Sequence, residues 1–218
     1  IQILYSSNQP MVIDAVLILN GHIKAFGQDA RSIAKQKGIK AESAERKLLA
    51  PCLVDPHSIL IDPFHGKNET IKTLRQKAAN SGFGQIGLLP KGSNWRDQPG
   101  LFQGFQNDVS DILMHPWGSF SIQGEGQELS SHANLIQQGA IGIAECDSVP
   151  PIQLLRKGLL ANEIGKHPLL LAPRDEEIQG DGMVREGVET LRAGWDPDPV
   201  ESETLPLCQL LEIHRQYK

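Results

Sequence analysis

The sequence contains little of what several protein classes require. Its three cysteines, Cys52, Cys146 and Cys208, lie far apart and form no CxxC pair, so they indicate neither a disulfide framework nor a zinc ribbon. No run approaches the roughly 18 apolar residues of a membrane span, and no secretory leader is recognisable. The net charge is −5 without a long basic run, which predicts no nucleic-acid partner. These absences predict a cytoplasmic protein with reduced thiols.

The composition is that of a folded chain. Hydrophobic residues make up 39% and charged residues 22% of the 218 residues, which suffices for a packed core. The length allows one large domain, or one domain with a small appendage. GxxxxGK[ST] does not occur, so the phosphate loop of a P-loop nucleotide-binding sheet is lacking.

The first fifty residues favour short strands. Apolar residues at 16–19 and 22–26 flank Asn20-Gly21, a pair that suits a tight hairpin because both turn positions need a positive φ. The polar stretch 29–47 predicts a loop or a short helix. A different pattern begins near Leu48.

From there, short apolar runs alternate with helical patterns, as in a parallel sheet covered by helices. We expect five strands, at residues 49–55, 85–89, 111–114, 140–144 and 168–171. The first expected helix follows Asn68 as N-cap, with Ile71, Leu74 and Ala78 inward, and the second spans residues 129–138. The third follows Ser148, with Ile152, Leu155 and Leu159 inward. The last begins at Ser202 and carries Leu207, Leu210, Leu211 and His214 at helical spacing.

Residues 50–57, which read Ala-Pro-Cys-Leu-Val-Asp-Pro-His, resemble the end of the first barrel strand in the amidohydrolase superfamily, where the pattern is Pro-Gly-Leu-Val-Asp-x-His-x-His. Further matches, in chain order, indicate the dihydroorotase branch: Asp62-Pro63, Gly82-Phe83 with Pro90, residues 139–143, residues 182–187 and Ser202-Glu203. The chain resembles the N-terminal half of such a protein, closest to the divergent dihydroorotase-like proteins of cyanobacterial type. The resemblance implies an α/β fold, with a β-sandwich or hairpin segment over 1–49 and a partial (β/α)8 barrel of about five units over 50–218.

The resemblance also implies a metal site that this sequence fills only in part. A dihydroorotase polarises an amide carbonyl with a metal held at the C-terminal rim of the barrel. His57 stands at the first position of His-x-His, but Ile59 stands at the second. The fourth-strand ligand falls near Glu145 or Cys146, and the fifth-strand His falls at Ala172. His57 and Glu145 therefore remain as vestigial metal ligands, too few for a tightly bound zinc.

Substrate contacts implied by the family have changed as well. The position of its substrate-carboxylate Arg holds Ile61, and that of its substrate-binding Asn holds Lys91. Lys91 remains the candidate substrate-binding residue, because a point charge still attracts an acidic ligand without copying the planar fork of an arginine. No residue is assigned a catalytic role.

Each candidate also has an ordinary structural interpretation. His57 suits a hydrogen-bonded histidine at a strand end, and His65 is an alternative ligand from a loop. Cys146 suits a buried structural thiol. Asp55 and Asp62 suit either an acid/base pair or carboxylates that bind the backbone of the following loop.

Four further residues are expected outside any site. His132 and His214 fall on predicted helix surfaces or edges. Trp117 and Trp195 are expected to serve as packing residues or loop anchors.

Two functional hypotheses remain open. The first is a catalytically impaired dihydroorotase-like protein linked to pyrimidine biosynthesis, a pseudoenzyme with a structural or regulatory role and no cofactor. The alternative is an active cyclic amidohydrolase with zinc in a rebuilt site that uses His57, His65, Asp62 or Glu145. Such a site needs residues beyond Lys218, and the missing initiator Met favours a longer parent chain. We expect a homo-oligomer or a protein partner; inactive relatives suggest aspartate carbamoyltransferase.

Overall fold

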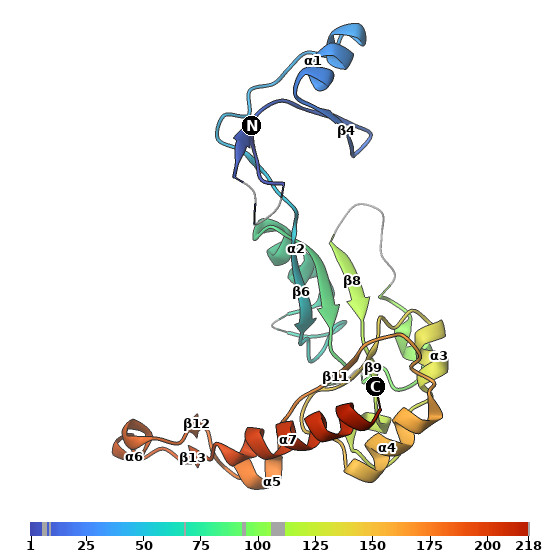
Figure 1. Cartoon of the computed structure of the whole chain (residues 1–218), viewed down its shortest axis with the longest axis vertical. Helices are drawn as coiled ribbons and strands as arrows, with labels where there is room; N and C mark the ends of the chain where they lie inside the picture. Colours follow the sequence, from blue (N-terminus) through green and yellow to red (C-terminus); the bar gives the residue numbers. More distant parts are fainter. Residues whose placement is uncertain (6–7, 9, 68, 93–94, 106–111, 218) are drawn as a thin grey trace. The chain divides into compact units, whose positions relative to one another are not determined.

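The computed structural model describes residues 1–5, 8, 10–67, 69–92, 95–105 and 112–217. The chain divides into two compact units, Ile1–Leu53 and Val54–Lys218, and each is described by itself. Figure 1 gives the labels of the elements along the chain.

The first unit contains two small sheets and one helix. Strand β1 (Gln2–Ile3) pairs antiparallel with β2 (Val12–Ile13) and parallel with β5 (Leu48–Leu49). Strands β3 (Val16–Leu19) and β4 (His22–Phe26) form an antiparallel hairpin, and helix α1 (Gly27–Gln36) follows.

The predicted hairpin is confirmed. Asn20 and Gly21 connect β3 and β4 with φ values of 52° and 74°, both in the left-handed region that the turn requires. The register shifts between Leu17 and Ile18, which marks a β-bulge. The Asn20-Gly21 pair therefore forms the turn of the β3–β4 hairpin, as the sequence predicted.

The second unit is built on two three-stranded sheets whose strands follow chain order (Figure 1). Strands β7 and β8 are parallel, and so are β9, β10 and β11. Along β6 and β7 the contacts also advance together, since Gly87 lies against Pro56 and the Leu89 amide donates to the Ser58 carbonyl. The strands are β6 (Leu53–Ser58), β7 (Phe83–Leu88), β8 (Leu113–Pro116), β9 (Gly118–Ser119), β10 (Ile143–Glu145) and β11 (Leu169–Leu171).

Trp117 joins the two sheets. It is the single residue between β8 and β9, and its amide donates to the Leu88 carbonyl at 2.9 Å. The backbone from β8 to β9 thus serves as one extended segment between β7 and β10. The α/β class and a succession of five parallel strand positions agree with the sequence prediction.

Helices connect and cover these strands. Helix α2 follows β6, α3 follows β9 and α4 follows β10, and α7 is the longest helix (Figure 1). Two 3-10 turns, Pro99–Phe102 and Ile122–Gly124, lie in the loops after β7 and β9. The helices are α2 (Ile71–Asn80), α3 (His132–Gln137), α4 (Ile152–Ala161), α5 (Glu176–Gln179), α6 (Val188–Ala193) and α7 (Glu201–Gln216).

The core consists of three clusters, of which two lie on the helix-facing side of the strands and one lies on the opposite side. On the helix-facing side, α2 packs on β7 and β8 through Ile71, Ala78, Ile86 and Met114. A second helix-facing cluster packs α3 and α4 on β10; it comprises Phe102, Phe120, Leu135, Ala140, Ile143, Leu154, Leu155 and Ile164. The opposite face, called here the inner face, carries Leu89, Trp117 and Ala144, with Ile141, Cys146 and Leu170 against them.

The first predicted strand was misplaced. Residues 49–55 were expected to form a buried strand, but β6 begins at Leu53 and extends to Ser58. Leu53 and Val54 are each 54% exposed. The reason is that β6 ends the strand order of its sheet among the described residues, so it has a neighbour on one side only.

Several helix predictions need correction. Asn68, the expected N-cap, lies outside the described residues, and Thr70 caps α2 through reciprocal bonds with Thr73. The helix expected over 129–138 is shorter, since Leu129 pairs with Ser121 in a β-bridge. Ile152 points outward and is 42% exposed, because α4 buries the next row, Leu154, Leu155 and Gly158.

The C-terminal region also differs from its prediction. Helix α7 turns Leu210 and Ile213 toward the core and leaves Leu207 and Leu211 exposed. Between β11 and α7, where the sequence predicted no regular element, the chain contains α5, α6 and two short parallel strands, β12 (Val184–Arg185) and β13 (Pro197–Asp198). Of the expected third strand, Asp111 lies outside the described residues.

Candidate functional site

His57 and its neighbours lie at the end of β6 and are exposed. The His57 amide donates to Oδ1 of Asp55 at 3.1 Å, and the His57 Nδ1 lies 3.9 Å from the same oxygen. The Ser58 hydroxyl donates to the other Asp55 oxygen at 2.5 Å. Ile59 and Ile61, which follow, are 48% and 65% exposed. Asp55 therefore bonds to the backbone that follows it, which is one of the two roles predicted for this carboxylate.

The second aspartate also binds backbone. Oδ1 of Asp62 accepts hydrogen bonds from the amides of Phe64 at 3.3 Å and His65 at 2.9 Å. His65 itself is exposed. The described contacts of Asp62 thus support a loop-ordering role and do not link it to Asp55.

Glu145 is buried at the end of β10. Its two carboxylate oxygens accept from the Ser121 hydroxyl at 2.6 Å and from the Ser121 amide at 3.1 Å. Burial raises the pKa of this carboxyl above its usual range, and the Ser121 hydrogen bonds oppose the shift. The group is therefore a satisfied, partly desolvated carboxyl.

The side chain of Glu145 faces the helices. Along β10, Ile143 packs with α3 and α4, whereas Ala144 packs with Trp117 on the inner face, so the faces alternate along the strand. Glu145 accordingly lines a cavity of about 570 Å³ beside Pro151 and other helix-side residues. Of the two candidate ligands at the end of the fourth predicted strand, Glu145 and Cys146, it is Cys146 that packs against the inner cluster.

Lys91 and Cys146 lie just after the C-terminal ends of β7 and β10, and each bonds to the segment that follows the other strand. Lys91, just after β7, forms a hydrogen-bonded ion pair with Asp147, just after β10. The hydrogen bond to Asp147 raises the pKa of Lys91. The Cys146 thiol donates to the Pro90 carbonyl at 3.1 Å, and burial raises its pKa to about 11. The thiol is thus held protonated, which suits a structural role.

Arg96 is a central residue that the sequence prediction missed. It is 1% exposed, its Nε donates to the Trp117 carbonyl at 2.9 Å, and its NH2 group donates to the Leu88 carbonyl at 2.8 Å. Its guanidinium lies 5.0 Å from the Phe105 ring centroid. Burial lowers the pKa of Arg96 to about 10. A single arginine in a polar loop carries no pattern that would reveal these contacts.

His132 lies in the interior, contrary to its prediction on a helix surface. It is 1% exposed, and its ring centroid lies 5.0 Å from that of Phe120. Its Nε2 is 2.9 Å from the Phe120 carbonyl, which can only accept, so Nε2 carries a proton. Burial lowers the pKa of His132. His214 is exposed, as expected.

The two tryptophans play different parts. Trp117 is 6% exposed and is a packing residue, as predicted. Trp195 is 58% exposed and lies after α6.

The described residues do not fit a catalytic zinc centre. Within residues 1–5, 8, 10–67, 69–92, 95–105 and 112–217, no group of three or more His, Cys, Asp or Glu side chains could hold a metal ion. The amide of Ala172, at the fifth-strand position, donates to the Glu145 carbonyl at 3.0 Å, and its methyl side chain offers no ligand atom.

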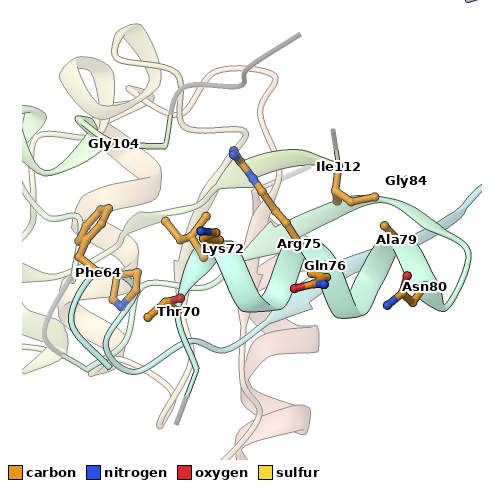
Figure 2. Close-up of a pocket in the computed structure, with 12 residues that line it drawn as sticks. Phe64, Thr70, Lys72, Arg75, Gln76, Ala79, Asn80, Gly84, Gly104 and Ile112 are labelled. Atoms are coloured by element: carbon orange, nitrogen blue, oxygen red, sulfur yellow. The ribbon is translucent and has the colours of Figure 1, made fainter. Parts of the chain in front are cut away.

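A cavity of about 1150 Å³ lies along α2 (Figure 2). Thr70, Lys72, Arg75 and Gln76 line it from the helix. Its other walls include Gly104 and Ile112, which flank a segment outside the described residues. For that reason we assign no site to it.

Among the described residues, no helix has the length and apolar character needed to cross a membrane. No family model matches the chain.

Curated proteins give significant matches. A probable dihydroorotase-like protein of Synechocystis sp. is 29% identical over 197 residues, which are 79% of this chain and 45% of that protein. Dihydroorotases of Geobacter sp. and Lactobacillus helveticus are 27% and 28% identical; each match covers 89% of this chain and 46% and 45% of the relative, respectively. The chain is thus a homologue of dihydroorotase-like proteins, which confirms the resemblance. It spans a little under half the length of these relatives.

Proposed function

We propose that this chain is part of a dihydroorotase-like protein that serves pyrimidine biosynthesis without catalysing the dihydroorotase reaction itself. The observation that carries the proposal is a combination. Similarity to dihydroorotases extends over 89% of the chain, yet Ile59 and Ala172 stand at two positions where the resemblance implies metal-binding histidines. Neither side chain has an atom that can ligate a metal.

The proposal assigns the chain to a known architecture. We infer that β6, β7, the continuous β8–β9 segment, β10 and β11 are five strands of a (β/α)8 barrel and that residues 1–49 are its accompanying β-sandwich segment. The parallel pairing and the strand order that follows the chain support the barrel. The two small sheets of the first unit are compatible with the sandwich.

The environment of the remaining ligand candidates supports impairment. The Glu145 carboxylate is committed to Ser121 and lies on the helix-facing side of β10, whereas a barrel site needs side chains at the inner rim. His57 is left as a single exposed imidazole. Two such groups do not provide the three protein ligands that a catalytic zinc usually has.

Substrate orientation is weakened in the same way. Ile61 replaces the arginine that the family uses for the substrate carboxylate, and Lys91 is engaged by Asp147. Orientation contributes several kcal/mol of barrier lowering, so its loss alone would slow turnover strongly. Weak binding of a dicarboxylate at Lys91, without turnover, is the most that we expect.

The retained role in this proposal is structural or regulatory. We propose a cytoplasmic location, which suits the three free cysteines, and association with itself or with a protein partner. By resemblance to inactive dihydroorotase homologues, the partner proposed is aspartate carbamoyltransferase.

The test is a dihydroorotase assay of the purified chain with added zinc, followed in both directions from carbamoyl aspartate and from dihydroorotate. The dihydroorotase of Geobacter sp. serves as the positive control. We expect no turnover above the rate without protein. Turnover that survives repurification and is abolished by His57→Ala would instead establish the alternative, an active amidohydrolase with a rebuilt zinc site.

A further inference from the structure

The segments that follow β9, β10 and β11 surround a second cavity, of about 570 Å³, which is called here the acidic cavity. Gln209 of α7 completes its lining. Ligands of α/β proteins commonly bind beyond the carboxyl ends of parallel strands. The volume lies within the range of about 300–1,000 Å³ that is usual for small-molecule pockets. Lys91 and Cys146, both in the described part of the chain, do not line it, so it is separate from the rim where the resemblance implies substrate and metal.

Hydrogen bonds within the chain fix the walls of the acidic cavity. The Gly126 amide donates to the Ser121 hydroxyl at 2.9 Å, and this hydroxyl donates to Oε1 of Glu145 at 2.6 Å. These bonds tie the loop after β9 to the end of β10. The Val149 amide donates to the Arg174 carbonyl at 2.9 Å, which ties the loop after β10 to the segment after β11. The cavity is therefore preformed, as small-molecule sites usually are.

The lining is strongly acidic. Among the described residues that form it, five are Asp or Glu and one, Arg174, is basic. The Nε of Arg174 is engaged by the side-chain oxygen of Gln179 at 2.7 Å. Glu125, Glu176 and Glu177 are exposed, and their side chains form no salt bridge within the ranges that the structure describes. The cavity therefore has surplus negative charge and attracts cations.

Glu145 is the buried carboxyl of the lining, with 6% exposure. Its printed hydrogen-bond donors are the amide and hydroxyl of Ser121, which are neutral. No Lys, Arg or His in the described part of the chain forms a salt bridge with it. Buried carboxylates are usually paired with a cation. A cation bound in the cavity would supply this counter-charge.

The distribution of the carboxyl groups distinguishes between kinds of cation. They line a cavity, and among the described residues no three His, Cys, Asp or Glu side chains converge on one point as a metal ion requires. Apolar side chains share the same lining, in the run Val149-Pro150-Pro151-Ile152. Separated carboxylates beside an apolar wall suit a ligand with several positive groups joined by methylene segments.

We infer that the acidic cavity binds an organic cation with at least two ammonium groups on an aliphatic chain, the chemistry of a polyamine. Neighbouring lysine side chains of a peptide present the same groups, so the test includes both sources. The inference does not depend on the proposed function, because it uses no metal, no dihydroorotase substrate and neither His57 nor Lys91. Loss of either conclusion would leave the other standing.

The test is isothermal titration calorimetry of the full chain at about 0.15 M salt, where diffuse attraction between exposed charges is largely screened. The probes are spermidine, the monoamine 1-aminopentane and the dipeptide acetyl-Lys-Lys-amide. Spermidine should bind one-to-one with a Kd below about 1 mM, at least about tenfold tighter than 1-aminopentane. Tighter binding of spermidine than of the dipeptide supports a free polyamine as the ligand, and the reverse order supports lysine side chains. Absence of spermidine binding, or equal affinity for the monoamine, overturns the inference.

Matched variants locate the site. Replacing Glu176 and Glu177 together by glutamine should weaken spermidine binding about three- to tenfold, because two lining carboxylates are lost. The control replaces Glu42 and Glu45, two exposed residues of the first unit, and makes the same change in net charge without loss of affinity. Equal effects of the two double variants would show diffuse attraction and overturn the inference. Glu145→Gln should weaken binding about tenfold or more, with circular dichroism as the check of folding; where it does not fold, the paired double variants decide.

Discussion

The indole Nε1 of Trp117 donates a hydrogen bond to the carbonyl oxygen of Pro56 at 2.8 Å. To reach it, the indole passes over β7 at Gly87, where an added Cβ would lie 3.0 Å from Nε1. Its six-membered ring lies against Gly142, where a Cβ would meet it at 2.6 Å. One side chain between β8 and β9 thus contacts the segments on both sides, from β6 to the start of β10. Glycine is needed at 87 and 142 because a Cβ there would meet the carbonyl oxygens of Pro56 at 2.2 Å and Pro168 at 2.4 Å as well as the indole.

Replacing this tryptophan should destabilise the second unit. Trp117→Phe removes the hydrogen bond to Pro56 and part of the contact with Gly142, and should cost about 2–4 kcal/mol of unfolding free energy. The matched control is Trp195→Phe, because Trp195 is 58% exposed and should change stability by less than about 0.5 kcal/mol. Denaturant unfolding followed by circular dichroism measures both. Equal effects of the two variants would show that Trp117 does not tie the strands together.

Arg96 should be the most sensitive charged residue in the loop after β7. Arg96→Met keeps much of the aliphatic volume but leaves the Leu88 and Trp117 carbonyls without these donors in a buried place. We expect a loss of about 1–3 kcal/mol, because the buried Trp117 carbonyl loses this donor whereas the Leu88 carbonyl keeps the hydrogen bond from the Trp117 amide. Arg192→Met on α6 is the control, as its side chain is 71% exposed in an i,i+3 pair with Glu189. Its effect should stay below about 0.5 kcal/mol. A small effect at Arg96 would mean that water replaces the guanidinium.

Local sequence chemistry predicted some elements and could not predict others. Asn20-Gly21 specified its hairpin because the required backbone angles belong to the two residues themselves. The apolar runs of β10 and β11 were visible because every residue of a buried parallel strand is apolar or nearly so. By contrast, the exposure of Ile152 and Leu211 depends on which row of the helix meets the sheet. Helical periodicity gives several apolar rows and does not choose among them.

The candidate site shows the same limit. That Ile59 stands where the resemblance implies a histidine is visible in the sequence alone. The direction of Glu145 is not, because it depends on strand register, and one residue of shift exchanges it with Cys146. Arg96 and His132 were missed because their burial comes from distant partners, the Leu88, Trp117 and Phe120 carbonyls.

Stability should fall in mild acid because of His132. Burial holds the pKa of His132 below its usual value of 6.5, so the unfolded chain takes up a proton at a higher pH than the folded chain. The neutral His132 ring therefore contributes its full share of the unfolding free energy above about pH 6.5. This share is lost as the pH falls through about 6.5 toward the pKa of His132 in the folded chain. His132→Gln keeps an N–H donor for the Phe120 carbonyl and does not titrate.

The measurement is the unfolding free energy of both proteins between pH 7.5 and 5.5. The advantage of the native protein over His132→Gln should shrink as the pH falls, whatever its size at neutral pH. His214→Gln on the exposed side of α7 controls for the loss of a histidine and should run parallel to the native curve. A constant difference between the native protein and His132→Gln would contradict the assignment of acid sensitivity to this ring.

Zinc should not bind stoichiometrically at His57. The residue is exposed on β6, Ile59 follows it at the second ligand position, and Glu145 is bonded to Ser121 on the helix-facing side of β10. A single imidazole binds zinc weakly, because stable sites use three or four protein ligands. Elemental analysis after dialysis against micromolar zinc should therefore give much less than one zinc per chain. His57→Ala should leave that value unchanged, and so should His22→Ala, a control at an exposed histidine of β4. A content near one zinc per chain that is lost in His57→Ala and kept in His22→Ala would mean that residues other than Ile59 and Ala172 complete a metal site around His57.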